Sequence, residues 1–192
     1  MPLSLEVICC PNCFSNHSSN IFTDHRIAGQ LGKTIISVGQ CDNCGFIFNT
    51  PRPTLDEIDR FYSSAMTASG QIYQDESSQG HYPKLMINRA QFLNNISSIN
   101  KNLKALDIGC GNGGFIKAVK TQFPNLHISG IDPSLQAVKN CINANLDVSQ
   151  NGVEDLGSSG IDCEYDLISI ISVLEHIPNP KLALTKISNL YL

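Results

Sequence analysis

Four cysteines near the amino terminus have the spacing of a metal site. Cys10 and Cys13 form one C-x-x-C pair, and Cys41 and Cys44 form a second pair that is followed by Gly45. A C-x-x-C turn directs two thiolates toward one point, and tetrahedral zinc needs four such ligands. The residues between the pairs are β-forming runs separated by glycines, as in a zinc ribbon. The sequence therefore predicts a structural zinc ion held by these four cysteines.

Other interpretations of the cysteines stay open. Cys9 could replace Cys10 as a ligand, although Cys10 gives the correct spacing, and His17 and His25 are alternative ligands. Free or redox-active thiols are the competing interpretation. A thioredoxin-like role would place one C-x-x-C pair at the start of a helix in a βαβ unit, and neither pair has that context.

A second candidate site lies in the segment LKALDIGCGNGG, residues 103–114. Its short apolar run is typical of a buried strand, and the glycines that follow allow sharp turns and a close approach of the backbone to a ligand. The next residues, FIKAVKTQF, are expected to be helical. The glycine loop would then lie at a helix amino terminus, where free N–H groups attract an anionic group of a ligand.

The residues around the glycine loop favour S-adenosylmethionine over NAD. Gly109, Gly111 and Gly114 fit the G-x-G-x-x-G pattern of dinucleotide sites, which is a weak signal alone. Asp107 would repel a pyrophosphate, but it could accept a hydrogen bond from the ammonium group of an amino acid. Asp132, at the end of a second apolar run, can accept hydrogen bonds from both ribose hydroxyls. An NAD-dependent enzyme remains an alternative.

These residues need a scaffold in which strands end side by side. Apolar runs predict strands at 103–108, 127–131, 147–150 and 165–172. Strands that alternate with helices indicate a parallel sheet. The predicted fold is therefore α/β, a Rossmann-like doubly wound sheet without its C-terminal strands, preceded by a small zinc-ribbon-like β domain. A further amphipathic helix before the first strand has one face formed by Leu85, Phe92, Leu93, Ile96 and Ile99.

The chain is expected to have three regions. They are a zinc-ribbon-like domain at 1–50, a helical linker or lid region at 51–100, and a partial Rossmann-like cofactor-binding domain at 101–192. The fourth strand, 165–172, would be left as an apolar edge, which is an aggregation hazard. We expect a missing C-terminal segment or self-association to cover this edge, and we interpret the chain as a fragment of a longer protein.

Composition limits the classes of partner. The 192 residues are 42% hydrophobic and 16% charged, with a formal net charge of −4. This composition is typical of a folded protein, and the charge gives no general electrostatic case for nucleic-acid binding. Neither a signal peptide nor an apolar run of membrane-spanning length is present, so we expect a cytoplasmic protein without a membrane partner.

Three motifs in order resemble those of the class I S-adenosylmethionine-dependent methyltransferases. They are LDIGCGNGG, GIDPS and ISVLEHIPNP, and the resemblance covers roughly residues 83–192. With the cysteine-rich ribbon in front, the chain also resembles bacterial methyltransferases of deoxysugar and polysaccharide pathways. The resemblance implies methyl transfer to a small-molecule acceptor, such as a nucleotide-linked sugar. The alternative is a non-catalytic zinc-ribbon and cofactor-binding fragment that contacts protein or nucleic acid.

The resemblance implies cofactor-binding roles for residues that follow the four strands. The methionine half would be lined by Asp107, Gly109, Cys110, Gly111 and Gly113, the adenosine half by Asp132, Pro133, Gly152, Val153 and Glu154, and the sulfonium by Ser172 and Val173. Many family members carry an acid where Gly152 stands, so Glu154 or the backbone would have to replace it. Asp132 could instead cap the following helix.

His176 is the candidate general base. It follows the fourth strand, and an ordinary histidine titrates near neutral pH. Such a base would assist transfer to a hydroxyl or an acidic C–H group. A solvated side chain without a catalytic role is the alternative.

Overall fold

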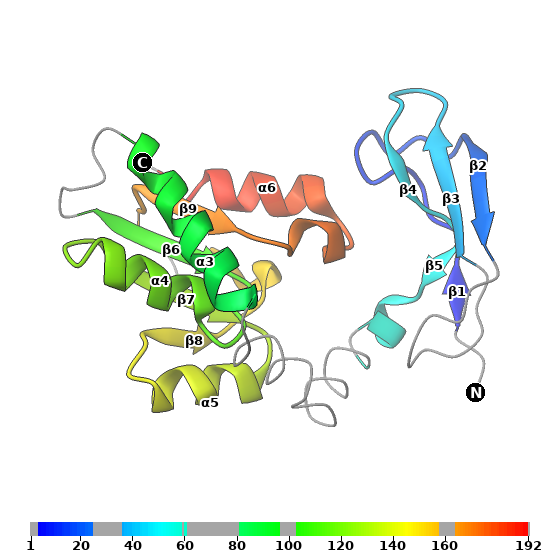
Figure 1. Ribbon diagram of the computed structural model, residues 1–192. Helices are drawn as coiled ribbons and strands as arrows, with labels where there is room; N and C mark the ends of the chain where they lie inside the picture. The colour runs from blue at the N-terminus through cyan, green and yellow to red at the C-terminus, as the bar shows by residue number, and fades with distance from the viewer. Residues whose placement is uncertain are drawn as a thin grey trace. The chain divides into compact units, whose positions relative to one another are not determined.

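The chain forms two compact units. The computed structural model describes residues 4–24, 36–58, 60, 81–96, 103–157 and 164–191 (Figure 1). The first unit comprises Met1–Tyr62 with Pro178–Lys181, and the second comprises Ser63–Ile177 with Leu182–Leu192. In the described part of the chain, no helix is both long and apolar enough to cross a bilayer.

The first unit is built from short antiparallel strands. β2 (Ser18–Asp24), β3 (Ile36–Cys41) and β4 (Ile47–Asn49) form a three-stranded sheet, and β1 (Leu5–Glu6) pairs with β5 (Arg52–Pro53). Its apolar cluster is formed by Cys10, Cys41 and Phe48, against which Ile8 and Cys13 pack. Two of the predicted metal ligands therefore lie in the small core of this unit.

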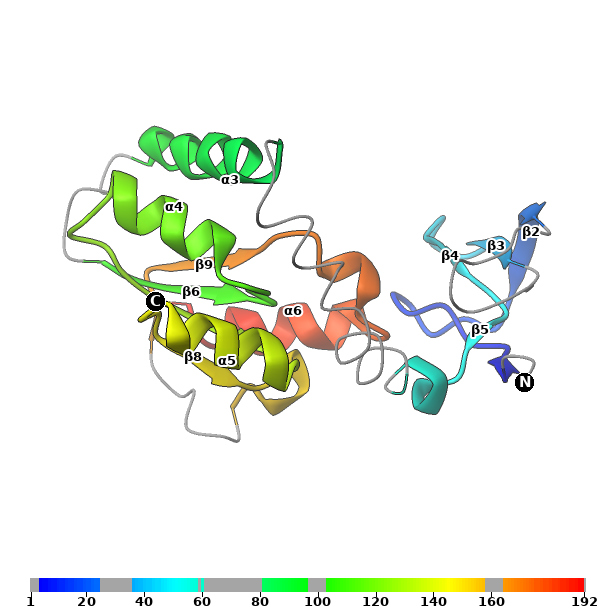
Figure 2. The same cartoon turned by 60° about the horizontal axis from the view of Figure 1, so that its bottom comes forward.

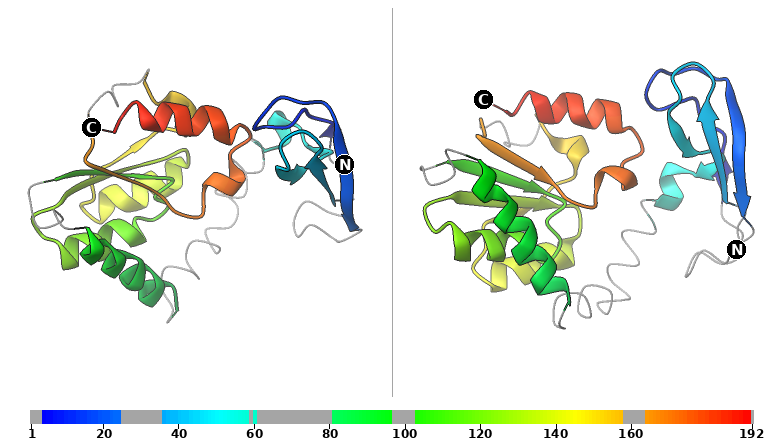
Figure 3. Two further views of the ribbon diagram at one scale, coloured as in Figure 1. Left: turned by 90° about the horizontal axis from the view of Figure 1, so that it is seen from above. Right: turned by 45° about the horizontal axis from the view of Figure 1, so that its top comes forward.

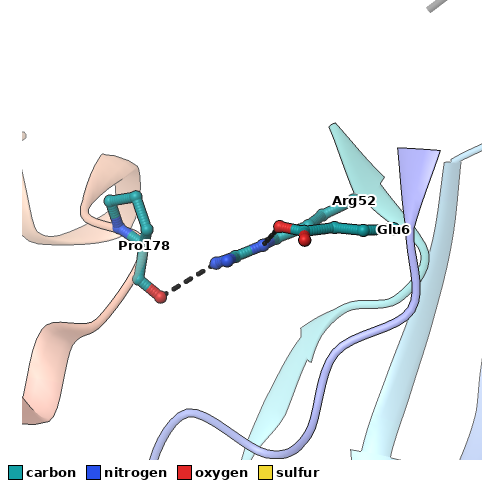
Figure 4. A network of polar contacts seen from close by, with 3 residues as sticks. All are labelled: Glu6, Arg52 and Pro178. Atoms are coloured by element: carbon teal, nitrogen blue, oxygen red, sulfur yellow. Dashed lines mark hydrogen bonds and ion pairs between the residues drawn. The ribbon is translucent and has the colours of Figure 1, made fainter. Parts of the chain in front are cut away.

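Arg52 holds β5 in place within the first unit. Its Nε donates to Oε1 of Glu6 on β1 at 3.0 Å, and its Nη1 donates to the carbonyl oxygen of Pro178 at 2.9 Å (Figure 4). The Arg52 side chain is 17% exposed and that of Glu6 is 36% exposed. An ion pair that water reaches is worth about 1 kcal/mol or less, so its main effect is to align the two strands.

The second unit contains a fully parallel sheet. Its strands are β6 (Lys104–Ile108), β7 (His127–Asp132), β8 (Val148–Gln150) and β9 (Leu167–Ile170), in the order β8-β7-β6-β9. The strand order reverses between β6 and β9, because β6 is followed along the chain by its other neighbour, β7. Ligands of open α/β sheets bind beyond the carboxyl ends of the strands at such a reversal.

Helices cover both faces of this sheet. The helical segments are α3 (His81–Gln91), η2 (Phe92–Asn95), α4 (Gly114–Gln122), α5 (Leu135–Asn143), η3 (Val153–Asp155), η4 (Leu174–His176) and α6 (Pro180–Ser188). One apolar cluster joins Ala105 to α3, α4 and α5, and another joins Leu106 to α6. Figure 2 shows α3 lying over α4, and the left view of Figure 3 shows the sheet between α3 and α6. The predicted fold class is confirmed.

The helix before β6 buries only part of the face that its apolar pattern predicts, because Leu93 and Ile96 pack in the core and Leu85 and Phe92 do not. Met86 and Ala90 are buried together with Leu93, whereas Leu85 and Phe92 are 44% and 71% exposed. The α-helix ends at Gln91 and a 3₁₀ turn follows, which changes the angular spacing of the side chains. Ile99 lies outside the described residues.

The outer edge of β9 is partly covered at its start. Tyr165 forms a parallel bridge with Tyr191, and its N–H donates to the carbonyl oxygen of Leu190 at 2.8 Å. On the opposite side, the N–H of Asp166 donates to Lys104 of β6. The side chains of β9 are half-buried along the whole strand.

Candidate functional site

The loop after β6 depends on glycine. Gly109, Gly111 and Gly113 have φ values of +70°, +53° and +71°, a region that residues with a Cβ rarely adopt. A Cβ on Gly109 would also collide with the side chain of Val173. The residues that follow β9 therefore pack directly on the glycine loop, as the strand reversal requires.

Asp107 is a buried carboxyl at the carboxyl end of β6. It is 3% exposed, and it faces Ser169 of β9 in the parallel register. The Ser169 hydroxyl donates to Oδ1 of Asp107 at 2.6 Å. Burial raises the pKa of Asp107 to about 7; the Ser169 hydrogen bond opposes this rise, and the charge of Asp132 adds to it. A cationic group nearby would stabilise the ionised form, so this position suits an ammonium ligand.

Asp132 ties the end of β7 to the glycine loop. Its Oδ2 accepts from the N–H of Gly111 at 2.8 Å, and its Oδ1 accepts from the N–H of Ser134 at 2.9 Å. Burial raises the pKa of this carboxyl, and the two backbone N–H groups oppose the rise. Each carboxylate oxygen keeps a further lone pair for a ligand. The cap of α5 is Ser134, whose Oγ accepts from Ala137.

Cys110 contributes backbone rather than a side chain to the loop. The residue is 5% exposed, and its thiol packs in the apolar cluster formed with α3, α4 and α5. A Cβ on Gly130 would lie 2.9 Å from its Sγ. Cys141 of α5 is also buried there, and its Sγ donates to the carbonyl oxygen of Gly111 at 3.2 Å. Only the backbone of Cys110 can face a ligand in the loop.

The residues after β8 form one turn of 3₁₀ helix. Val153 is buried and Glu154 is exposed. The N–H of Gly152 donates to Oδ2 of Asp155 at 2.8 Å, so Asp155 caps this turn. Sequence reasoning did not single out Asp155, because Gly152 has no side chain and the usual capping-box pattern is therefore absent.

The segment after β9 carries the remaining predicted residues. Ser172 has a φ of +56° and is exposed, Val173 is half-buried, and His176 lies exposed at the end of η4. Nη2 of Arg89 on α3 donates to the Ser172 hydroxyl at 3.4 Å. Arg89 was not predicted, because no local pattern relates a residue before β6 to one after β9.

The structure brings the four predicted metal ligands together. The Sγ atoms of Cys10, Cys13, Cys41 and Cys44 all lie within 4.8 Å of one another. The Cys10–Cys44 and Cys13–Cys41 sulfur pairs are 3.6 and 3.5 Å apart. Zinc–sulfur bonds of about 2.3 Å in a tetrahedron would place the sulfurs about 3.8 Å apart, so the cluster has the size of a zinc site.

The alternative ligands do not join this cluster. Cys9 is exposed, and neither it nor His17 belongs to the group of four in the described part of the chain. His25 lies outside the described residues. Of the ligand sets that the sequence leaves open, the four C-x-x-C cysteines are the set that the fold assembles.

The two C-x-x-C turns have the same backbone hydrogen bonds. In each, the N–H of the first cysteine donates to the carbonyl oxygen five residues later, and its carbonyl oxygen accepts from the N–H four residues later, at 2.8 to 2.9 Å. The fourth residue after Cys10 is Phe14, with a φ of +61°, and the fourth after Cys41 is Gly45, with a φ of +73°. Phe14 therefore holds a conformation that favours glycine.

Comparison with known proteins shows what the second unit resembles. A family model described as "Methyltransferase domain" matches residues 106–191. The chain is similar to a probable (S)-tetrahydroprotoberberine N-methyltransferase 2 of Papaver bracteatum, at 29% identity over 136 residues, which are 66% of this chain and 36% of that protein. The chain spans between 25% and 36% of the length of the curated relatives it matches.

Solved structures share the fold. The plantazolicin methyltransferase BpumL in complex with SAH has a TM-score of 0.55 and 18% identity, over 71% of this chain and 57% of that one. Magnesium protoporphyrin IX methyltransferase (ChlM) from Synechocystis PCC 6803, with bound SAM, has a TM-score of 0.54 and 18% identity, over 72% of each chain. Residues 106–191 thus match a methyltransferase family model, and the second unit shares its fold with methyltransferases whose structures contain SAM or SAH.

Proposed function

We propose that this protein binds S-adenosylmethionine at the loop between β6 and α4 and transfers its methyl group to a small-molecule acceptor. One observation carries the proposal: two buried carboxyls, Asp107 and Asp132, flank a loop of left-handed glycines at the reversal of strand order. A zwitterionic amino-acid group joined to a ribose has the complementary chemistry for this arrangement.

Each half of the cofactor has suitable partners. Asp107 would accept from the ammonium group, and its raised pKa means that it ionises most readily when such a cation is present. Asp132 would accept from the ribose hydroxyls with the lone pairs that Gly111 and Ser134 leave free. The remaining proposed contacts are Gly109, the Cys110 backbone and Gly113 in the loop, Pro133, Gly152, Val153 and Glu154 on the adenine side, and Ser172 and Val173 on the acceptor side.

The bound cofactor would supply an activated methyl group, so the protein's main tasks are alignment and exclusion of water. Holding the acceptor atom about 3 Å from the methyl carbon can contribute several kcal/mol. Val173 packs on Gly109 and would fix the wall of the site on that side. We propose His176 as the base that removes a proton from the acceptor. Full turnover by His176→Ala on the true acceptor would exclude this role.

We propose that the methyl acceptor is a small molecule. The relatives compared above are named as methyltransferases of an alkaloid, of plantazolicin and of a magnesium porphyrin. None of these names contains a sugar, so the nucleotide-linked sugar suggested by the ribbon receives no support from them.

We also propose a structural zinc ion on the four cysteines of the first unit. The unit buries only three residues in its apolar cluster, two of which are cysteines, among the residues that the structure describes. A core of this size supplies little hydrophobic stabilisation, and a tetrahedral zinc would add the missing free energy of folding. Elemental analysis should give about one zinc per chain, lost in Cys41→Ser; a folded, metal-free protein would contradict the proposal.

Calorimetry with S-adenosylhomocysteine tests the cofactor site. The wild-type chain should release heat and gain thermal stability on binding, and Asp107→Ala should do neither. Asp147→Ala is a matched control, since Asp147 is an exposed acid of the same unit. Absence of binding by the wild-type chain, or a response to NADH in its place, would overturn the proposal. Binding without turnover on any acceptor would favour the non-catalytic alternative.

A further inference from the structure

The side chains of two asparagines each reach from one C-x-x-C turn to a cysteine of the other turn. Asn12, in the first turn, points its Nδ2 at the Sγ of Cys44 in the second, and Asn43, in the second turn, points its Nδ2 at the Sγ of Cys13 in the first. Both distances are 3.6 Å. Each asparagine is the third residue of its own C-x-x-C, so the two contacts are equivalent in the two turns.

The four sulfurs differ in their exposure. Cys10 and Cys41 are 0% and 2% exposed and belong to the apolar cluster of the first unit. Cys13 is half-buried and Cys44 is exposed. The two cysteines that receive an asparagine amide are therefore the two that are not fully buried.

We propose that Asn12 and Asn43 are outer residues of the metal site that shield its solvent-facing sulfurs. This inference rests on the zinc site proposed above. A zinc ion with four thiolates carries two excess negative charges, and an amide N–H directed at a thiolate withdraws part of that charge. Because each amide comes from the opposite turn, the pair also holds the two turns together around the ion.

The shielding has a kinetic consequence. A chelator removes zinc by displacing one thiolate at a time, and the displaced sulfur must be one that solvent can reach. Cys13 and Cys44 are the accessible points of entry. The asparagine amides hold these sulfurs in place and favour the metal-bound thiolate, so their loss should increase the rate of zinc release.

A purely local role for the asparagines makes a different prediction. Asparagine and aspartate both favour tight turns, because their side chains bond to nearby backbone groups. If Asn12 and Asn43 served only the turns, aspartate would replace them without effect. As donors to thiolates they cannot be replaced by aspartate, since a carboxylate has no N–H and repels the charged site.

The experiment compares zinc release from the full chain and its variants. Zinc-loaded wild type, Asn12→Asp, Asn43→Asp and the double variant are mixed with 4-(2-pyridylazo)resorcinol, and the absorbance of the zinc–dye complex is followed. Asn16→Asp is the control, because Asn16 is an exposed asparagine close to the first turn. Circular dichroism before mixing establishes that the variants are folded.

We expect each single variant to release zinc about tenfold faster than wild type, in line with the usual cost of removing an outer partner. The double variant should be faster still, and Asn16→Asp should match wild type. Cobalt-loaded variants should show a shifted thiolate-to-cobalt absorption band. Release rates equal to that of Asn16→Asp would overturn the inference while leaving the zinc site intact, whereas a wild type without bound zinc would overturn both.

Discussion

The Ser169 hydroxyl donates to Oδ1 of Asp107 across the pair of strands at which the sheet order reverses. The distance is 2.6 Å. Burial raises the pKa of the Asp107 carboxyl, and the hydrogen bond from Ser169 opposes that rise. The two residues are 62 positions apart in the sequence. Their contact favours the ionised form of Asp107 at the proposed ammonium site.

Asp107→Asn should stabilise the cofactor-free protein more at pH 8 than at pH 5. The folded pKa of Asp107 is about 7 against an ordinary value of 3.8, so the folded state holds this proton more tightly than the unfolded state. In the wild type, the stability that protonated Asp107 contributes is fully present below its ordinary pKa. It is lost as pH rises through about 7, by about 1.4 kcal/mol for each pH unit between the two pKa values. Asparagine does not titrate. Melting temperatures of the wild type and of Asp107→Asn at the two pH values measure the gain in stability. A gain that is the same at both pH values would contradict the raised pKa.

Ser169→Ala should weaken the binding of S-adenosylhomocysteine, most strongly near neutral pH. Loss of the hydroxyl raises the pKa of Asp107 further, so a smaller fraction of the carboxyl is ionised at pH 7. At pH 9 most of the affinity should return. Titration calorimetry at both pH values measures this. Ser169→Thr keeps the hydroxyl and should retain binding; equal losses in both variants would point to packing as the cause.

Gly109→Ala should cost more stability than Gly157→Ala. Both glycines have positive φ, at +70° and +81°, but among the residues that the structure describes a Cβ on Gly157 meets nothing within 4 Å. Gly157→Ala therefore measures the backbone cost alone, about 1 kcal/mol. Gly109→Ala adds the collision with Val173. Urea unfolding gives both values. A second substitution, Val173→Ala, should recover part of the loss at Gly109 and none at Gly157.

Gly45→Ala should destabilise the first unit, while Phe14→Gly should be neutral or stabilising. Both positions are left-handed, and a Cβ on Gly45 would find only Gln40, at 3.9 Å, so the cost at Gly45 is conformational and about 1 kcal/mol. Phe14→Gly removes that cost, but it also removes a contact with Lys181, whose Nζ lies 5.5 Å from the ring centroid. An exposed cation–π contact is worth about 0.5–1 kcal/mol. Thermal unfolding of the zinc-loaded protein measures both changes. A large loss of stability in Phe14→Gly would contradict the idea that the backbone of Phe14 is strained.

Local patterns predicted the elements and the ligands that lie close together in sequence. The C-x-x-C spacing identified all four clustered cysteines, and the apolar runs located the four parallel strands to within a few residues. Asp107 and Asp132 could be found because each lies at the carboxyl end of a strand, Asp132 as the last residue of β7 and Asp107 as the last but one of β6. Glycine in the loop was predictable because the strand-to-helix turn requires positive φ.

Contacts between distant segments could not be predicted in this way. The hydrogen bonds of Ser169 and Arg89 join residues 62 and 83 positions apart, and those of Asn12 and Asn43 join residues 32 and 30 positions apart. The periodicity of a single sequence does not indicate such pairs. Part of the buried face of α3 was missed for a related reason, because a change of helix type at Phe92 depends on packing. The roles of the cofactor residues and of His176 remain predictions.

Asp132 has a consequence for the thermodynamics of ligand binding. Its carboxylate accepts from the Gly111 N–H at 2.8 Å, so a hydrogen bond within the folded chain itself restrains this glycine of the loop. Ordering one residue costs about 1–2 kcal/mol, and here folding bears that cost rather than binding. We therefore expect Gly111 to contribute little to the entropy lost when a ligand binds at the loop.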